Sequence, residues 1–277
     1  MVRNQRLRWG LSRWLVTLAV AGYLALTAYA WLAADGMLYY PNYGSRQAPL
    51  GGEMIRLADG SELSALYLPN PAARYTIWYF HGNAEDLGGI APRLHALHDL
   101  GFAVFAYDYP GYGLSSGHPS EARIYAASAA AWTTLTERYR VPPERIIVFG
   151  RSLGGGPAVD LAVRHPVAGL ILQSTFMSVY RVMTRWRLLP FDQFENLRKI
   201  GRVRCPVLVM HGRMDEVIPF YHGEAIYAAA PAPKRSYWVD GAGHNDLEQA
   251  AGERYARELT EFAAGLTTAG PRKTDFP

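Results

Sequence analysis

From residue 76 onward, short apolar runs alternate with longer segments of helical spacing, and this alternation narrows the possible folds more than any other feature. The runs cover residues 76–80, 102–107, 145–149, 168–172, 207–210 and 236–239. Continuously apolar runs suit strands that are buried on both faces, as in a mainly parallel sheet. The helical segments between and after them cover residues 90–100, 120–139, 153–164, 221–229 and 247–266. The chain is therefore predicted to form an α/β domain with a doubly wound, mainly parallel sheet.

The residues just before this alternation have a different pattern. Segments 54–57 and 63–68 flank the turn pair Asp59-Gly60, which predicts a hairpin of antiparallel strands that leads into the sheet. The sequence contains no internal repeat, low-complexity tract or linker that would divide the domain. We expect one domain over residues 35–269 and a disordered tail over 270–277.

The N-terminal segment has the composition of a membrane anchor. Residues 15–34 carry no charge, and Trp14 and Trp31 stand near the two ends of this stretch, a length and flanking pattern suited to one crossing of a bilayer. Arginines precede it at positions 3, 6, 8 and 13, and Asp35 follows. The positive-inside rule predicts a basic stub and anchor over residues 1–34, with a cytoplasmic N-terminus and the domain on the outer, periplasmic or extracytoplasmic, side.

A cleaved signal peptide is the alternative interpretation of the same segment. Ala28-Tyr29-Ala30 has the small-x-small form that signal peptidase recognises. Cleavage there would give a secreted domain, so both interpretations place it outside the cytoplasm.

Charge and cysteine content exclude several classes of protein. The formal net charge of +4 equals the contribution of the arginines before Asp35, so the rest of the chain is neutral, which argues against a nucleic-acid-binding surface. Cys205 is the only cysteine, so no intrachain disulfide can form, and we interpret it as a small buried residue at the start of a strand. No His, Asp or Glu spacing suits a metal, and we expect no metal or cofactor.

A G-x-S-x-G motif marks a candidate nucleophile. Gly150-Arg151-Ser152-Leu153-Gly154 directly follows an apolar run and precedes a helical segment. In a nucleophile elbow, a strained strand-to-helix turn presents the serine at the end of the sheet, and glycines on either side prevent side-chain collisions. Ser152 is therefore the predicted nucleophile.

Two further strand ends supply the partners that a serine nucleophile needs. His244 follows the last apolar run in the glycine-containing turn 241–246, and Asp215 follows the run 207–210. The carboxyl ends of parallel strands meet at one edge of a sheet, where His244 would act as the base and Asp215 would orient it. The order Ser152, Asp215, His244 matches the order of α/β-hydrolases.

An oxyanion requires backbone donors that are fixed before reaction. The N–H of Leu153 is one candidate, because it follows the serine and opens a helix. The other is the N–H of Asn83, or less favourably Ala84, in the loop His81-Gly82-Asn83-Ala84 after the first buried run. We interpret His81 as a structural residue that packs this loop.

Other carboxylates and histidines fit the catalytic roles less well. Asp108 follows a strand but precedes the serine, and its tight turn favours local hydrogen bonds. Glu216 would serve only with a different register of the loop that holds Asp215. None of the remaining histidines follows Asp215 in a glycine turn. They are His95, His98, His118, His165, His211 and His222.

Residues 175–204 interrupt the alternation. Tyr180, Trp186, Phe191 and Phe194 stand among arginines there, in the position where hydrolases of this architecture carry a cap over the active site. One or two additional surface helices are the alternative.

Taken together, the motifs HGNAED, YDYPGYGLSSG, GRSLGGGPAVDLA, CPVLVMHGRMDEVIP and GAGHND resemble the α/β-hydrolase superfamily. More narrowly, the chain is similar to small serine hydrolases with one N-terminal anchor, related to palmitoyl-protein thioesterases and monoacylglycerol or lysophospholipid lipases. The resemblance implies triad roles for Ser152, Asp215 and His244, and an oxyanion hole formed by Asn83 and Leu153. The thioesterase branch is anchored through a cysteine-rich N-terminus, a pattern that differs from the segment present here.

These features predict a serine hydrolase that cleaves carboxylic esters through an acyl-enzyme on Ser152. The apolar anchor and the aromatic cap favour acyl lipids or other apolar esters as substrates. Hydrolysis of amides, peptides or thioesters is the alternative within enzymes. A noncatalytic binding domain at the membrane is the alternative from another class.

Overall fold

The computed structural model describes residues 2–57 and 59–266, with side chains from residue 13 onward. The chain divides into two compact units, Met1–Tyr39 and Tyr40–Pro277. The predicted disordered tail, residues 270–277, lies outside the described residues.

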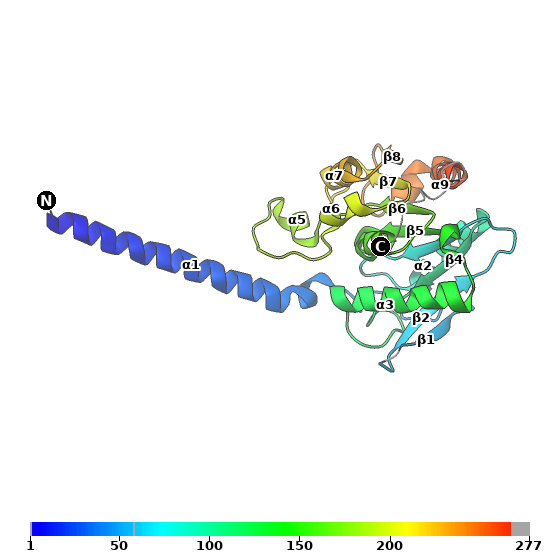
Figure 1. Cartoon of the computed structure of the whole chain (residues 1–277), viewed down its shortest axis with the longest axis horizontal. Coiled ribbons are helices and arrows are strands. Elements are labelled where there is room, and N and C mark those ends of the chain that lie inside the picture. The colour runs from blue at the N-terminus through cyan, green and yellow to red at the C-terminus, as the bar shows by residue number, and fades with distance from the viewer. Residues whose placement is uncertain (1, 58, 267–277) are drawn as a thin grey trace, which may run out of the picture. The chain divides into compact units, whose positions relative to one another are not determined.

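The first unit is a single long helix, α1 (Val2–Leu38) (Figure 1). Its stretch Arg13–Leu38 has the length and apolar composition to cross a membrane, and the apolar 18-residue window within it is not buried in the protein. The predicted span 15–34 lies inside it. The helix is thus a candidate anchor, and a signal sequence has the same properties.

The second unit is built on one sheet of eight strands in the order β1-β2-β4-β3-β5-β6-β7-β8 (Figure 1). β1 pairs with β2 and β2 with β4 in antiparallel fashion, and all the other pairs are parallel. The mainly parallel sheet with leading antiparallel strands is therefore confirmed. The strands are β1 (Glu53–Arg56), β2 (Glu62–Leu68), β3 (Thr76–Phe80), β4 (Ala103–Tyr107), β5 (Ile146–Arg151), β6 (Gly169–Gln173), β7 (Val207–Gly212) and β8 (Lys234–Val239).

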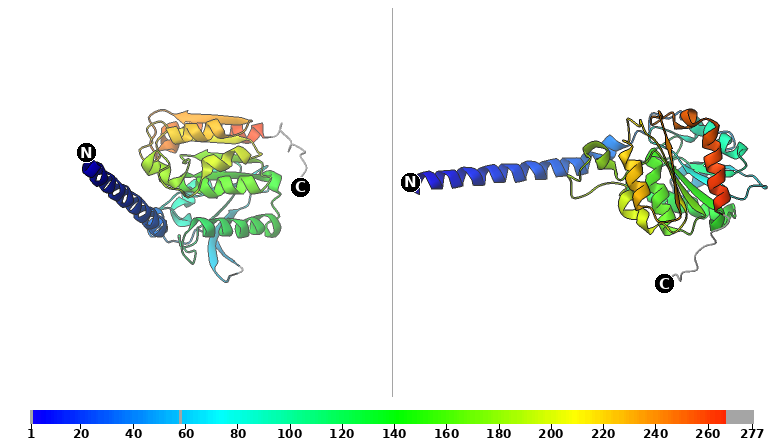
Figure 2. Two further views of the ribbon diagram at one scale, coloured as in Figure 1. Left: turned by 60° about the vertical axis from the view of Figure 1, so that its left-hand side comes forward. Right: turned by 90° about the horizontal axis from the view of Figure 1, so that it is seen from above.

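Helices cover both faces of this sheet (Figure 2). Those after α1 are α2 (Leu87–Asp99), α3 (Glu121–Thr133), α4 (Gly155–Arg164), α5 (Val179–Thr184), α6 (Asn196–Lys199), α7 (Tyr221–Ala229), α8 (Leu247–Ala251) and α9 (Glu253–Gly265). The sides of α2 and α9 that contain Leu94 and Phe262 share one hydrophobic core with Ile77 and Tyr79 of β3. On the other face, Trp78 of β3 stacks against Trp132 of α3.

Burial explains why the central strands are mostly apolar. All residues of β3, β4, β5 and β6 are buried. Because successive side chains in a strand point to opposite faces, a sheet covered on both sides leaves no position for an exposed polar residue. The edge strand β8 has exposed and half-buried positions instead.

Two helices end or break where the apolar spacing alone predicts continuity. The expected helix 247–266 is divided at Gly252, whose φ of 55° is a conformation that glycine adopts readily. The expected helix 120–139 passes into a π-helical turn at Thr134–Arg138. There the hydroxyls of Thr134 and Thr136 bond carbonyls four residues earlier, which can perturb the helical ladder.

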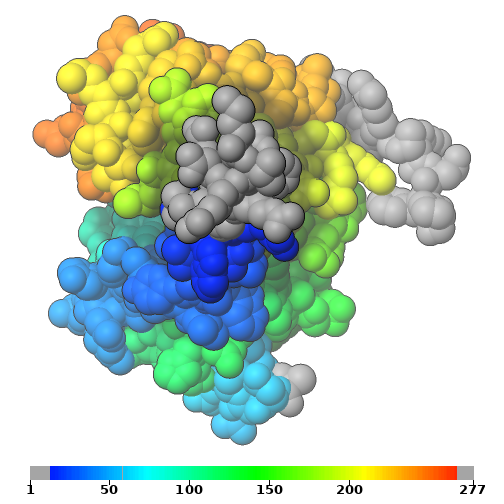
Figure 3. All heavy atoms as spheres, turned by 90° about the vertical axis from the view of Figure 1, so that its left-hand side faces the viewer, coloured from blue at the N-terminus to red at the C-terminus, as the bar shows by residue number. Residues whose placement is uncertain are grey.

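Residues 175–204 form two short helices, α5 and α6, joined by an irregular segment. The aromatic residues there differ in environment: Phe194 is fully buried, whereas Trp186 is 69% exposed. Met183 and Leu188 on either side of Trp186 are also exposed. In Figure 3 this yellow-green segment lies beside the yellow and orange residues of the last part of the domain. Whether it acts as a cap stays a prediction.

Hydrogen bonds fasten the start of this segment and close its interior. The N–H of Met177 donates to Nδ1 of His222 at the start of α7, over 3.1 Å. Within the segment, the N–H of Tyr180 donates to Oδ1 of Asp192 over 2.9 Å. The exposed apolar residues therefore lie on a segment whose base is fixed to the domain.

Candidate active site

Ser152 stands on a sharp turn between β5 and α4. The turn is a short 3₁₀ segment, Ser152–Gly154, and Ser152 has a φ of 51°. A positive φ at a residue other than glycine is strained and is characteristic of a nucleophile elbow. A Cβ on Gly154 would overlap the carbonyl of Phe80, and one on Gly150 would lie 2.6 Å from Cβ of Ala158. The two glycines are therefore required by close packing around the turn.

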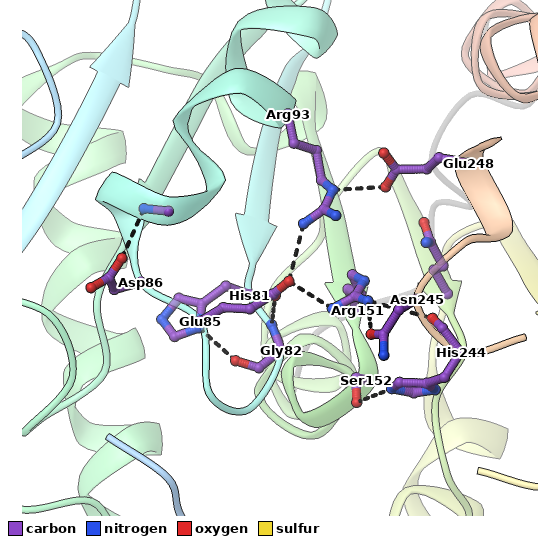
Figure 4. Close-up of polar contacts among 12 residues, drawn as sticks. His81, Gly82, Glu85, Asp86, Arg93, Arg151, Ser152, His244, Asn245 and Glu248 are labelled. Carbon is purple, nitrogen blue, oxygen red and sulfur yellow. Dashed lines mark hydrogen bonds and ion pairs between the residues drawn. The ribbon is translucent and has the colours of Figure 1, made fainter. Parts of the chain in front are cut away.

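The three residues predicted to form the triad come together at one edge of the sheet. Nε2 of His244 lies 2.9 Å from Oγ of Ser152, and Nδ1 lies 2.8 Å from Oδ2 of Asp215. Figure 4 shows the Ser152 and His244 side chains directed toward one another. All three residues are buried. This geometry permits a proton to pass from the serine hydroxyl to the imidazole while the carboxylate holds the ring.

Asp215 is held as an ionised acceptor. Its Oδ1 accepts from the N–H of Ile218 over 2.7 Å and of Val217 over 3.0 Å. Burial opposes ionisation, but hydrogen bonds from His211 and His244 outweigh it and hold the pKa of the Asp215 carboxyl well below its usual range. The carboxylate is thus suited to stabilise a positive charge on the His244 ring.

His211 is a second neighbour of Asp215, and the sequence pattern gave it no catalytic role. Its Nε2 lies 3.2 Å from Oδ2 of Asp215 and 2.8 Å from the carbonyl oxygen of Ile218. It stands in β7 near the strand's carboxyl end, four residues before Asp215. The spacing of four residues could have indicated this contact from the sequence, because the turn after β7 brings Asp215 close to the end of the strand.

The loop that carries Asn83 adjoins the elbow. A Cβ on Gly154 would contact the carbonyl oxygens of both Phe80 and His81, so the backbone that leads into this loop packs directly on the turn after Ser152. Leu153 lies within that turn. The two predicted oxyanion donors therefore belong to adjoining backbone segments.

The Asn83 side chain is itself anchored. Its Oδ1 accepts from the N–H of Tyr40, the N–H of Ala84 and the hydroxyl of Tyr112. Ala84 has a φ of 60°, a strained conformation that fixes the direction of the loop. These contacts hold the backbone on either side of the Asn83 N–H.

The rival residues have other partners. Oδ1 of Asp108 accepts from the N–H of Leu87 at the start of α2 and lies 3.6 Å from Nε2 of His81, and both Asp108 and His81 are fully buried. These contacts agree with structural roles for both. Glu216 accepts from the backbone N–H of His244, over 3.3 Å, rather than from its ring.

A group of charged side chains lies on one side of Ser152 and His244 (Figure 4). Arg151, which directly precedes the nucleophile, is buried and bonded to Glu85. Arg93 of α2 contacts both Glu85 and Glu248. No sequence pattern predicted a role for these residues, because the partners lie far apart in the chain.

The part of the chain that the structure describes contains one buried thiol and no cluster of metal-ligating side chains. Residues 2–57 and 59–266 contain no group of three or more His, Cys, Asp or Glu side chains that could hold a metal ion. Cys205 is buried just before β7, and burial raises the pKa of its thiol to about 12.

Comparison with known proteins places the chain in a family. Residues 71–197 match the family model described as serine aminopeptidase, S33. The α/β-hydrolase domain-containing protein 17B of Xenopus laevis is 41% identical over 215 residues, which cover 76% of this chain and 74% of the relative. The chain belongs to this α/β-hydrolase family. Human protein 17C of the same family is 47% identical over 202 residues, and the match spans 69% of this chain and 59% of the relative.

Solved structures of α/β-hydrolases have the same fold at lower identity. Esterase Pf2001 of Pyrococcus furiosus superposes with a TM-score of 0.66 at 19% identity, over 77% of this chain and 91% of the esterase. The α/β-hydrolase domain-containing protein 10 from mouse gives 0.61 at 17% identity, over 78% of this chain and 99% of that protein. These similarities establish the fold.

Proposed function

We propose that this α/β-hydrolase cleaves carboxylic esters through an acyl-enzyme on Ser152. The observation that carries the proposal is the continuous chain of contacts from Oγ of Ser152 through the His244 ring to the carboxylate of Asp215. A serine hydroxyl is a weak nucleophile until an adjacent base removes its proton, and the contact to His244 provides that base.

The reaction then follows from the roles of these groups. Oγ of Ser152 attacks the ester carbonyl while Nε2 of His244 takes its proton, and the imidazolium is stabilised by Asp215. The negative charge that develops on the carbonyl oxygen is placed against the backbone N–H groups of Asn83 and Leu153. His244 returns the proton to the leaving alcohol, and a water molecule activated by the same ring releases the acid.

The exposed apolar residues of the segment after β6 favour an apolar acyl group. Met183, Trp186 and Leu188 are exposed on the segment after β6, whose base contacts α7. Exposed large apolar residues gathered on one loop are typical of surfaces that meet lipid or apolar ligands. Acyl lipids or similar apolar esters are therefore the proposed substrates.

A panel of substrates tests this choice. With p-nitrophenyl esters of increasing acyl length, kcat/KM should rise by up to about fourfold per methylene group until the binding surface is filled. Monoacylglycerols and a peptide amide should be assayed alongside, because the matching family model is described as a serine aminopeptidase. Faster cleavage of the peptide amide than of every ester would contradict the ester proposal and favour a peptidase. A thioester of the best acyl chain would distinguish thioester hydrolysis.

We also propose that α1 anchors the protein in a membrane with the domain on the outer side. The helix supplies the apolar stretch, and Arg13 lies at its N-terminal side. Protease added to intact spheroplasts should digest the domain while a tag before residue 13 stays protected. Protection of the domain would contradict this orientation, and a mature N-terminus near residue 31 would indicate a cleaved signal peptide instead.

A further inference from the structure

Arg151 is an unusual residue for its position. It is a charged residue that ends an otherwise uncharged strand, and its side chain is only 5% exposed. A buried guanidinium is unfavourable unless its N–H groups are paired, because the charge loses its hydration. The elbow itself requires glycine at positions 150 and 154 and a serine between them, but it has no need of an arginine.

The guanidinium forms bonds in two directions. On one side, Nη1 donates to Oε1 of Glu85 over 2.8 Å. On the other, Nη2 donates to Oδ1 of Asn245 over 2.9 Å and lies 3.4 Å from the carbonyl oxygen of His244. One side chain next to Ser152 thus connects the loop after β3 with the loop after β8 (Figure 4).

The contact with Glu85 reaches the predicted oxyanion donor. Oε2 of Glu85 accepts from the N–H of Gly82 over 2.6 Å, which closes the loop around Asn83. A Cβ on Gly82 would lie 2.9 Å from both Nη1 of Arg151 and Oε2 of Glu85. The backbone that flanks Asn83 is therefore packed against the ion pair, and a shift of that pair would move the Asn83 N–H.

A second pair repeats this connection. Arg93 of α2 donates to Oε1 of Glu85 over 3.2 Å and to Oε1 of Glu248 over 2.7 Å. Glu248 stands in α8, directly after the loop that holds His244. Two arginines and two glutamates alternate, so each charge has an opposite partner. Burial raises the pKa of the Glu85 carboxyl, but Arg151 and Arg93 together lower it below its usual value.

We propose that Arg151 is a positioning residue that holds the Asn83 loop and the His244 loop at fixed places on either side of Ser152. This inference rests on the proposed function and adds to it. The guanidinium contacts Glu85, Asn245 and the carbonyl oxygen of His244 rather than Oγ of Ser152 or the His244 ring. It acts by keeping the donor for the oxyanion and the base for the serine in register with the nucleophile.

A purely structural role for the Arg151–Glu85 ion pair leads to a different expectation for the variants. Removing one partner of a buried pair leaves the other charge unpaired and destabilises the protein, whereas replacing both by apolar residues can restore stability. In Arg151→Met/Glu85→Leu, Arg93 keeps its bond to Glu248 and the Gly82 N–H loses its acceptor. This variant should therefore unfold closer to the wild-type temperature than Arg151→Met does. If the pair only stabilises the fold, this variant should also regain full activity. If it positions the site, activity should stay low.

The double variant is expected to lose about 10²-fold in kcat, since a displacement of about 1 Å in a catalytic group has an effect of this size. KM should change by less than about threefold, because the pair contacts the loops that carry Asn83 and His244 rather than Oγ of Ser152 or the His244 ring. Arg151→Lys keeps the charge but cannot bond both loops with one planar group. Its kcat should lie between those of the wild type and Arg151→Met/Glu85→Leu. The control is Arg235→Met/Glu258→Leu, a more exposed pair between β8 and α9, which should leave kcat unchanged.

The imidazole nitrogen resonances of His244 provide a measurement that does not depend on turnover. They should shift or broaden in Arg151→Met/Glu85→Leu and stay unchanged in the Arg235 control. Absence of esterase activity in the wild type would refute the proposed function alone, since the resonances would still report on positioning. A stable Arg151→Met/Glu85→Leu protein with wild-type His244 resonances and, where the wild type is active, wild-type kcat would overturn the inference.

Discussion

Ser152→Ala should lower the kcat for ester hydrolysis by about 10⁶-fold, the size of effect expected when the nucleophile of a serine hydrolase is removed. Alanine has no Oγ, so no acyl-enzyme can form and Nε2 of His244 loses the partner that it has at 2.9 Å. The residual rate would come from the oxyanion donors and substrate binding alone. Initial rates on the best ester from the substrate panel measure the effect.

A second buried serine serves as the control for this variant. Ser128 of α3 donates to the carbonyl of Ile124 over 2.8 Å and contacts the hydroxyl of Tyr107, away from the site. Ser128→Ala should change kcat by less than about twofold while costing about 1 kcal/mol of stability through the lost hydrogen bond. If Ser152→Ala kept more than a thousandth of wild-type activity, the assignment of the nucleophile would be wrong.

Asp215→Asn should lower kcat by about 10⁴-fold with little change in KM, because an amide favours the wrong tautomer of the histidine and cannot stabilise the imidazolium. The contact at stake is the 2.8 Å hydrogen bond to Nδ1 of His244. Glu216→Gln is the matched control. Glu216 adjoins Asp215 but bonds only the His244 backbone N–H, so its kcat should fall by less than about tenfold.

Asp215→Asn should also change how the free energy of unfolding depends on pH. The pKa of Asp215 is lower in the folded protein than in the unfolded chain, where it is about 3.9. Its contribution to stability is therefore present above that value and is lost as the pH falls through the lower folded pKa. The difference in unfolding free energy between wild type and Asp215→Asn should shrink below about pH 4. A difference that grew as the pH fell would contradict the assignment of Asp215 as a stabilised carboxylate.

The sequence predicted the sheet and the meeting of Ser152, Asp215 and His244 because each depends on local pattern. Runs that are apolar at every position identify strands covered on both faces, and residues just after parallel strands must share one edge. The break at Gly252 was harder to predict, since glycine is also tolerated inside helices. The partners of Arg151 are not encoded by any local pattern, because Glu85 and Asn245 reach it only once the sheet has formed. The structure of residues 175–204 was not predictable in detail because it depends on how single side chains pack. Phe194, for example, is buried, whereas Trp186 is exposed.

The most direct test of the central claim is to react the full-length protein with a fluorophosphonate and locate the adduct by peptide mass spectrometry. Such probes react with a serine that an adjacent base has activated. We expect one adduct per chain, on Ser152, that fails to form in Ser152→Ala and forms far more slowly in Asp215→Asn. An unlabelled folded wild-type protein, or an adduct on a different residue, would contradict the assignment of Ser152 as an activated nucleophile.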